Sequence, residues 1–114
     1  MKGIGIDLIE IKRIKKIGLN QISKRILSEK EYKIYNQINN LNRKLSFIAG
    51  RWAGKEAIFK AYQKGHSQNK YHEWSILNNE KYGFPYIENT KNHKIMISIT
   101  HEKNYAAAFV IILA

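Results

Sequence analysis

Two carboxylates in apolar, glycine-bearing settings are the residues of this chain best suited to chemistry. Asp7 follows the alternating glycine–isoleucine run 3–6 and is the only aspartate in the sequence. Glu56 lies in the segment 50–61, among lysines and next to a tryptophan-bearing turn. Two carboxylates with basic side chains nearby are what a site for a divalent metal and a phosphate ester requires.

Helical spacing places a lysine on the same face as Glu56. At about 100° per residue, Trp52 and Lys60 lie about 40° to either side of Glu56, whereas Arg51 and Lys55 share another flank. The alternative is an ordinary surface pair of Glu56 with Lys60, worth about 0.3–0.5 kcal/mol. Trp52 favours a partly buried face, where an unneutralised charge is costly.

Asp7 and His101 also have ordinary structural explanations. A strand-end aspartate is often a turn former or the cap of a following helix. The glycines before Asp7 lack the rest of a phosphate-binding fingerprint and are also suited to close approach by a neighbouring strand. His101 follows the segment 95–100, where Ser98 and Thr100 give one edge polar character, and an exposed turn histidine is the alternative there. No nucleophile-elbow sequence surrounds Ser98, which argues against a serine hydrolase.

The first half of the chain is predicted to hold one strand and several helices. Residues 2–9 alternate as a strand does, and helical spacing follows over 11–17, with a break at 18–20 and a short segment at 21–27. Ser28-Glu29-Lys30-Glu31 matches a capping box that opens a helix to about residue 38, before a turn at 39–40. Residues 42–63 lack proline and keep a 3.6-residue rhythm, which predicts one long helix.

The second half changes to short strands, which we expect at residues 72–78, 85–87, 94–100 and 105–113. At 114 residues, the chain is expected to form a single domain over 1–114. The class is α+β, with an antiparallel sheet packed against one long helix and shorter helices.

Charge and composition limit the possible partners. The formal net charge of +11 predicts an acidic partner, but 16 lysines against 4 arginines also fit a general compositional bias. Clustered arginines interleaved with exposed aromatics, typical of nucleic-acid binding, are not evident. The absence of cysteine excludes disulfides and zinc–thiolate sites. No apolar run approaches the roughly 20 residues of a membrane span, and the early charges do not suit a signal peptide, so we expect a cytoplasmic protein.

Five ordered segments together resemble the holo-acyl-carrier-protein synthases, the small bacterial 4′-phosphopantetheinyl transferases. The third segment, with Arg51-Trp52-Ala53-Gly54-Lys55-Glu56-Ala57 and Lys60-Ala61, looks like the hallmark of that family. The resemblance covers nearly the whole chain and implies the 4′-phosphopantetheinyl transferase fold. The segments are Gly3–Ile14, Arg25–Glu31, Phe47–Ala61, Gly83–Tyr86, and Ser98–His101 with the following Tyr105–Ala108.

The resemblance implies transfer of the 4′-phosphopantetheine arm of coenzyme A to a serine of an acyl carrier protein, in fatty acid biosynthesis, with release of adenosine 3′,5′-bisphosphate. Asp7 and Glu56 would bind Mg²⁺ together with the pyrophosphate of coenzyme A. The catalytic residues would be Glu56, Lys60 and His101, with Glu56 as the base and Lys60 offsetting charge on the leaving group. Contacts to coenzyme A would come from Arg43, Lys44, Arg51, Lys60 and His101.

Acyl carrier proteins are strongly acidic, so the resemblance also implies a basic docking surface on the first helices. The members of this family are trimers with active sites between subunits, so a homotrimer is expected. No nucleic-acid or membrane partner is implied. The expected docking residues are Arg13, Lys16, Ile17, Ile22, Lys24 and Arg25.

The chain departs from the family pattern in three places. Gly54 stands where the family usually has alanine, which loosens a helix by up to about 1 kcal/mol. Residues 62–67 replace a Gly-Thr-Gly loop, and the segment 89–93 looks shortened. Two other functions therefore stay open: a carrier-protein-binding module without catalysis, if the altered loop disables coenzyme A binding, and a basic nucleic-acid-binding domain.

Overall fold

A computed structural model describes residues 2–62, 68–88 and 93–113 of the protein. The long helix predicted over 42–63 begins one residue earlier than predicted and runs to Tyr62, and residue 63 lies outside the described residues. In chain order the elements are β1 (Gly3–Glu10), α1 (Ile11–Ile17), α2 (Leu19–Ile26), α3 (Glu29–Asn36), α4 (Leu41–Tyr62), the 3₁₀ helix η1 (Gln68–Glu73), β2 (Ser75–Asn78), β3 (Pro85–Glu88), β4 (Lys94–His101) and β5 (Tyr105–Leu113).

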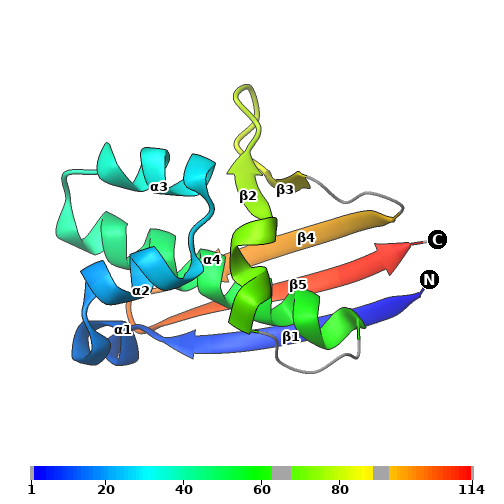
Figure 1. Ribbon diagram of the computed structural model, residues 1–114, viewed down its shortest axis with the longest axis horizontal. Helices are drawn as coiled ribbons and strands as arrows, with labels where there is room; N and C mark the ends of the chain where they lie inside the picture. Colours follow the sequence, from blue (N-terminus) through cyan, green and yellow to red (C-terminus); the bar gives the residue numbers. More distant parts are fainter. Residues whose placement is uncertain (1, 63–67, 89–92, 114) are drawn as a thin grey trace.

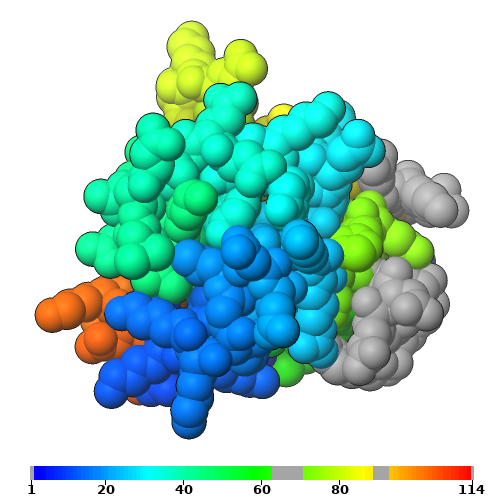
Figure 2. Space-filling view, turned by 60° about the vertical axis from the view of Figure 1, so that its left-hand side comes forward, coloured from blue at the N-terminus to red at the C-terminus, as the bar shows by residue number. Residues whose placement is uncertain are grey.

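The strands form two antiparallel sheets, which confirms the predicted α+β class. The larger sheet has the order β1-β5-β4, and β2 pairs with β3 in a separate hairpin. Figure 1 shows α4 running along the larger sheet, with α1, α2 and α3 gathered at one end, at the left, and the β2–β3 hairpin projecting at the top of the view. Helices α1 to α3 make up much of the molecular surface seen in Figure 2.

The contact between β1 and α4 is made backbone to backbone. A Cβ atom on Gly3 would lie 2.0 Å from the carbonyl oxygen of Ala61, and one on Gly5 would lie 2.0 Å from that of Ala57. Only glycine permits this approach, so the alternating glycines serve a helix rather than a neighbouring strand. Because alternate residues of a strand share a face, Asp7 lies on the same side of β1 as both glycines.

Local sequence signals define the helix boundaries. Gly18 has a φ of 109°, a conformation that other residues rarely adopt, and it separates α1 from α2. The predicted capping box is present: Ser28 Oγ accepts from the Glu31 backbone N–H, and Glu31 Oε1 accepts from the Ser28 N–H at 2.8 Å. Asn40 caps the start of α4: its Oδ1 accepts a hydrogen bond from the Arg43 N–H at 3.0 Å.

The two faces of the larger sheet differ sharply. The face toward α4 carries the core, in which Ile9, Ala108 and Val110 are buried. The opposite face carries large apolar side chains that are open to solvent in a single chain, including Ile4, Ile6, Leu8, Met96 and Phe109. Exposed apolar surface of this extent is typical of an interaction face.

The predicted strand over 72–78 is wrong in its first three residues. Residues up to Glu73 belong to η1, and β2 starts at Ser75. Tertiary contacts hold η1: among them, the buried Lys55 ammonium donates to the carbonyl of Tyr71, and His72 Nε2 lies 3.1 Å from the carbonyl of Lys24. These contacts come from distant parts of the chain, so strand propensity is overridden.

Two of the departures from the family pattern lie largely outside the described residues, which exclude 63–67 and 89–92. The third, Gly54, is buried, and a Cβ atom there would lie 2.6 Å from Ile76 Cδ1 and 3.0 Å from Ile97 Cδ1. Among the helices that the structure describes, none combines the length and apolar character that crossing a bilayer demands.

Candidate active site

Asp7 is a half-buried carboxylate that Lys60 partly covers. Its side chain is 15% exposed, and Lys60 Nζ donates to Asp7 Oδ1 at 3.1 Å and to the carbonyl of Ile6 at 3.0 Å. The second oxygen, Asp7 Oδ2, is buried and has no hydrogen-bond partner among the described residues. Such an oxygen is costly to bury, and a cation or a donor from a ligand would compensate it.

Glu56 lies one helical turn before Lys60 on α4. Gly3 meets Ala61 and Gly5 meets Ala57, so each two-residue step along β1 moves about one turn toward the start of α4. At the same register, the next step would place Asp7 level with the turn of α4 that ends at Glu56. The two carboxylates would then stand on neighbouring elements, at about the same level of the β1–α4 contact.

Tyr71 of η1 contacts the Glu56 carboxylate. Its hydroxyl donates to Glu56 Oε1 at 2.7 Å, and the tyrosine is only 1% exposed. Burial raises the pKa of Tyr71, and the hydrogen bond to Glu56 raises it further, so the hydroxyl keeps its proton and acts as a donor. Sequence reasoning missed this residue, because it lies in a segment that was predicted to adjoin a strand and carries no motif.

Asp7 and Glu56 carry the type of oxygen ligand that a hard divalent cation prefers. Asp7 and Glu56 offer carboxylate ligands, and Asp7 Oδ2 lacks a partner in the described part of the chain. Within that part there is no group of three or more His, Cys, Asp or Glu side chains able to hold a metal ion. One or two carboxylates are enough for Mg²⁺ when substrate phosphates and water complete its shell. The site is therefore suited to a metal that binds together with an anionic substrate.

Arg51 lies on another flank of α4 than Glu56 and Lys60, and its contact with coenzyme A stays a prediction. It is 7% exposed, its guanidinium lies 4.1 Å from the centre of the Phe47 ring, and Nη2 donates to Asn78 Oδ1. Burial lowers the pKa of Arg51 to about 10, and the nearby Glu31 charge acts in the opposite direction, raising this pKa. The flank of α4 that carries this arginine faces the β2–β3 hairpin rather than solvent.

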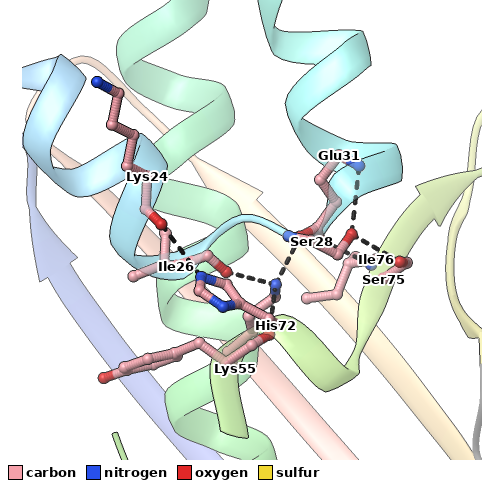
Figure 3. A network of polar contacts seen from close by, with 9 residues as sticks. Lys24, Ile26, Ser28, Glu31, Lys55, His72, Ser75 and Ile76 are labelled. Carbon is pink, nitrogen blue, oxygen red and sulfur yellow. Dashed lines mark hydrogen bonds and ion pairs between the residues drawn. The ribbon is translucent and has the colours of Figure 1, made fainter. Parts of the chain in front are cut away.

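Lys55, on the same flank as Arg51, is the centre of a buried polar network, shown in Figure 3. Its ammonium donates to the carbonyls of Ile26 and Tyr71, at 2.6 and 2.9 Å, and pairs with the Glu31 carboxylate. Glu31 Oε2 in turn accepts from the Ile76 N–H at 2.8 Å. Burial lowers the pKa of Lys55, and the Glu31 charge opposes this shift. The network fastens α2, α3, η1 and β2 to α4.

A basic pocket of about 720 Å³ lies between α1, the start of α4 and the turn after β4. It brings together two residues expected to bind coenzyme A, Arg43 and His101. In Figure 2 these segments adjoin at the left, α1 in dark blue, α4 in green and the turn in orange. Lys44 lies elsewhere, with its ammonium 4.8 Å from the centre of the Tyr35 ring and beside a separate pocket. The other cations of the basic pocket are Lys12, Lys15 and Lys103.

Within one chain this basic pocket is separate from the contact of Asp7 with Lys60. Asp7 of β1 pairs with Ala108 of β5. His101 of β4 pairs with Ala106 on the other edge of β5. The two site residues therefore stand on opposite outer strands of the sheet, β1 and β4. A single chain does not bring all of the expected site residues together.

Most of the expected docking residues are exposed on α1 and α2, but one is not. Ile22 is fully buried, so its prediction as a docking contact is wrong: the apolar stripe of α2 packs against the core. The Arg13 guanidinium lies 4.9 Å from the centre of the Trp52 ring, one turn before Glu56. The exposed residues of the set are Arg13, Lys16, Ile17, Lys24 and Arg25.

Comparison with known proteins agrees with this fold. Residues 3–110 match the model of the 4′-phosphopantetheinyl transferase superfamily. A holo-[acyl-carrier-protein] synthase of Onion yellows phytoplasma is 52% identical over 121 residues, covering 98% of this chain and 94% of that protein. A holo-[acyl-carrier-protein] synthase of Acholeplasma laidlawii is 41% identical over 111 residues, covering 96% of this chain and 93% of that protein.

Solved structures show the same architecture. A holo-(acyl-carrier-protein) synthase from Bacillus anthracis in complex with CoA (3′,5′-ADP) has a TM-score of 0.88 at 35% identity, covering 97% of this chain and 95% of that one. The Helicobacter pylori synthase in complex with coenzyme A has a TM-score of 0.80 at 30% identity, with coverage of 96% and 99%. The family match over almost the full length, together with these relatives, places the chain in the 4′-phosphopantetheinyl transferase superfamily.

Proposed function

We propose that this protein transfers the 4′-phosphopantetheine group of coenzyme A to a serine of an apo-acyl carrier protein. The serine oxygen forms a bond to the phosphorus on the pantetheine side of the pyrophosphate, and the bond from that phosphorus to the bridging oxygen breaks. Adenosine 3′,5′-bisphosphate leaves. The observation that carries this proposal is the Asp7–Lys60 contact, with its unpartnered carboxylate oxygen, at the level of Glu56.

Each residue at this contact has a role that its chemistry supports. Asp7 and Glu56 would hold Mg²⁺, which supplies charge neutralisation at the pyrophosphate when it is bound. Lys60 Nζ is on a side chain 58% exposed, so the ammonium can leave Asp7 and donate to a phosphate oxygen of the leaving group. Glu56 takes the proton of the serine hydroxyl.

The basic pocket supports binding of the nucleotide half of coenzyme A. Arg43 and His101 both line it, and a cationic fork is suited to a phosphate dianion. Lys44, half-buried beside Tyr35, stays part of the proposal as a contact to coenzyme A, although it lines a separate pocket. His101 is proposed to border the phosphates.

A homotrimer with sites between subunits forms part of the proposal. Two observations support it: the exposed apolar face of the larger sheet, and the separation of His101 from Asp7 within one chain. An assembly would cover that face and bring His101 of one subunit toward Asp7 of another. We also propose that residues 1–114 act as a single transferase domain, in the cytoplasm and in fatty acid biosynthesis, where apo-carrier protein and coenzyme A meet.

Docking of the acidic carrier protein is proposed on α1 and α2. Arg13, Lys16, Lys24 and Arg25 are exposed and basic, and Ile17 offers an apolar contact among them. Charges of this kind mainly steer and orient the encounter. Arg13 also lies over Trp52, so the docking surface adjoins the turn that precedes Glu56.

The test is a transfer assay read by intact mass. The protein is incubated with coenzyme A, Mg²⁺ and an apo-acyl carrier protein, and a gain of one phosphopantetheine per carrier is expected. Asp7→Asn and Glu56→Gln abolish the gain while circular dichroism shows an intact fold. Glu88→Gln, which removes a surface carboxylate paired with Lys30, is the matched control and retains the gain. Unchanged turnover in Asp7→Asn or Glu56→Gln would refute the metal-site assignment.

The mass assay also separates the two other functions that the sequence left open. A carrier-binding module without catalysis would bind the carrier protein without any gain in mass. A nucleic-acid-binding domain would bind DNA or RNA with a steep dependence on salt and would give no mass gain either.

A further inference from the structure

The hydroxyl of Tyr71 is aimed at the carboxylate that the proposed function uses as base and metal ligand. It donates to Glu56 Oε1 at 2.7 Å from η1, an element that follows α4 in the chain. The residue is 1% exposed, so water does not compete for this hydrogen bond from the tyrosine side. A buried donor of this kind restricts rotation of the carboxylate that accepts from it.

Tyr71 is itself held at both its ring and its backbone. The Phe59 ring meets the Tyr71 ring edge to face, with centroids 5.2 Å apart and an interplanar angle of 74°. Phe59 packs in the same way on Trp74, with centroids 5.3 Å apart. The carbonyl of Tyr71 accepts from the buried Lys55 ammonium at 2.9 Å.

Two consecutive residues of α4, Lys55 and Glu56, therefore both form hydrogen bonds with Tyr71 of η1. Lys55 fixes the backbone of Tyr71 by its ammonium, and Glu56 receives the hydroxyl of Tyr71 in return. Because Lys55 is anchored to Glu31, the orientation of the tyrosine is tied to the interior of the protein rather than to its surface. Rigid support of this kind is what a ligand carboxylate needs to keep a productive geometry.

We infer that Tyr71 is a positioning residue, which orients the Glu56 carboxylate for the divalent cation and the pyrophosphate of the substrate. This inference rests on the proposed function. In this role Tyr71 acts through Glu56, to which its hydroxyl donates. Partners of metal-binding carboxylates typically contribute roughly 10-fold to 100-fold in metal affinity or activity.

The experiment compares Mn²⁺ binding by the wild-type protein and the Tyr71→Phe variant, each saturated with coenzyme A. Calorimetric titration with Mn²⁺ measures the affinity, and coenzyme A alone gives the background. We expect Tyr71→Phe to bind Mn²⁺ about 10-fold more weakly. Carrier modification at low Mn²⁺ should fall in parallel, and saturating Mn²⁺ should restore turnover to within about 3-fold, because Glu56 is still present.

Tyr35→Phe is the matched control. Tyr35 is also buried, at 3% exposure, but it packs between α3 and α4 on Phe47 and Lys44, away from Glu56. Removal of its hydroxyl should leave Mn²⁺ affinity unchanged. Thermal unfolding of both variants shows that each retains its fold, since neither change removes a ring.

The outcomes separate the two proposals. Equal Mn²⁺ affinity in wild type and Tyr71→Phe overturns the positioning role, while the transfer reaction of the wild type leaves the proposed function standing. Equal weakening by Tyr71→Phe and Tyr35→Phe also overturns it, because the effect would then be general loosening of the fold. Absence of Mn²⁺ binding and of transfer in the wild type overturns the proposed function and the inference together.

Discussion

The Lys60 ammonium donates to Asp7 Oδ1 at 3.1 Å, joining the last turns of α4 to the middle of β1. Spacing along the helix predicts a lysine beside Glu56, but the contact that forms is with a strand more than fifty residues earlier in the chain. The lysine also donates to the carbonyl of Ile6. Lys60 thus pairs with the Asp7 carboxylate from a side chain that is largely in solvent.

Replacement of Lys60 should separate metal binding from transfer. We expect Lys60→Met to lower the transfer rate roughly 100-fold, because a cation near the leaving phosphate is lost. Its Mn²⁺ affinity should not decrease, since the removed ammonium competes with the metal for Asp7. Transfer assays at saturating Mn²⁺, with calorimetric titration of the metal, measure the two quantities.

Lys94→Met is the control for this change, because Lys94 is exposed at the start of β4 and is not among the residues proposed to bind the metal or coenzyme A. It should behave as wild type in both assays. A Lys60→Met variant with wild-type turnover would contradict the role of Lys60 at the phosphate. A Lys60→Met variant that no longer binds Mn²⁺ would show that the lysine supports the metal site instead.

Gly5 should tolerate no side chain. In Gly5→Ala the new Cβ would lie 2.0 Å from the Ala57 carbonyl oxygen, so backbone must move, and we expect a loss of about 3 kcal/mol in the free energy of unfolding. The displacement carries Asp7 with it, so transfer should fall even at temperatures where the variant is folded. Urea denaturation and the mass assay measure these effects.

Gly50→Ala tests whether any added methyl group has the same effect. A Cβ at Gly50 would lie 3.2 Å from Ile99 Cγ2, a side-chain atom, and alanine gains about 1 kcal/mol of helix propensity over glycine. We expect its free energy of unfolding to stay within about 1 kcal/mol of wild type. Equal losses for both variants would argue against a special backbone contact at Gly5.

The elements that the sequence predicts well are those governed by local signals. The capping box fixes the start of α3 between Ser28 and Glu31, which are three residues apart and contact each other directly. The antiparallel strands at 94–101 and 105–113 follow from alternation and a short turn. The conformation of the residues before β2 depends on contacts with residues distant in sequence, so the strand predicted there begins too early.

The buried ion pair of Lys55 with Glu31 should be far more sensitive to mutation than a surface pair. We expect Lys55→Met to lower the free energy of unfolding by about 3–5 kcal/mol, because it leaves the Glu31 carboxylate buried without its cation. The carbonyl of Ile26 and that of Tyr71 lose their donor as well. Denaturation with urea at neutral pH measures the change.

Lys30→Met is the matched control, since Lys30 pairs with Glu88 at 2.9 Å with side chains 62% and 30% exposed. A pair of this kind contributes about 0–1 kcal/mol, and we expect a loss in that range. Should Lys55→Met prove as mild as Lys30→Met, the buried network would not be a main support of α4.

The exposed apolar sheet face should be required for assembly. Ile6 and Leu8 are 63% and 61% exposed in a single chain, and a lysine at either position would place a charge in the proposed subunit interface. We expect Ile6→Lys and Leu8→Lys to shift the protein from trimer to monomer in analytical ultracentrifugation. Ile34→Lys, on α3 away from this sheet, is the control and should stay trimeric. A wild-type protein that sediments as a monomer would contradict the trimer.

Charge reversal on α2 should weaken use of the carrier protein alone. We expect Lys24→Glu and Arg25→Glu to raise the KM for the carrier on the order of 10-fold at low ionic strength, and the difference to shrink in high salt. The KM for coenzyme A should be unaltered. Lys33→Glu on α3 serves as the control, and an equal effect there would show that net charge rather than a docking surface matters.

The site is predictable from the sequence only in part. Asp7, Glu56 and Lys60 stand out by residue type, and the resemblance assigns their roles. The burial of Arg51 is not predictable from spacing, because α4 is buried on nearly all sides over 48–59 and no flank is marked as exposed. The contact of Tyr71 with Glu56 is not predictable for another reason. A hydrogen bond between residues on different elements produces no periodic pattern in the sequence.

The direct contact of the β1 backbone with α4 has a consequence for ligand binding. Where main-chain atoms touch, the spacing between strand and helix does not depend on which rotamers the neighbouring side chains adopt. The position of the Asp7 carboxylate relative to α4 is therefore fixed by the two glycine contacts before any cation or nucleotide binds. Less conformational entropy is then lost on association, so more of the interaction energy remains for the transition state.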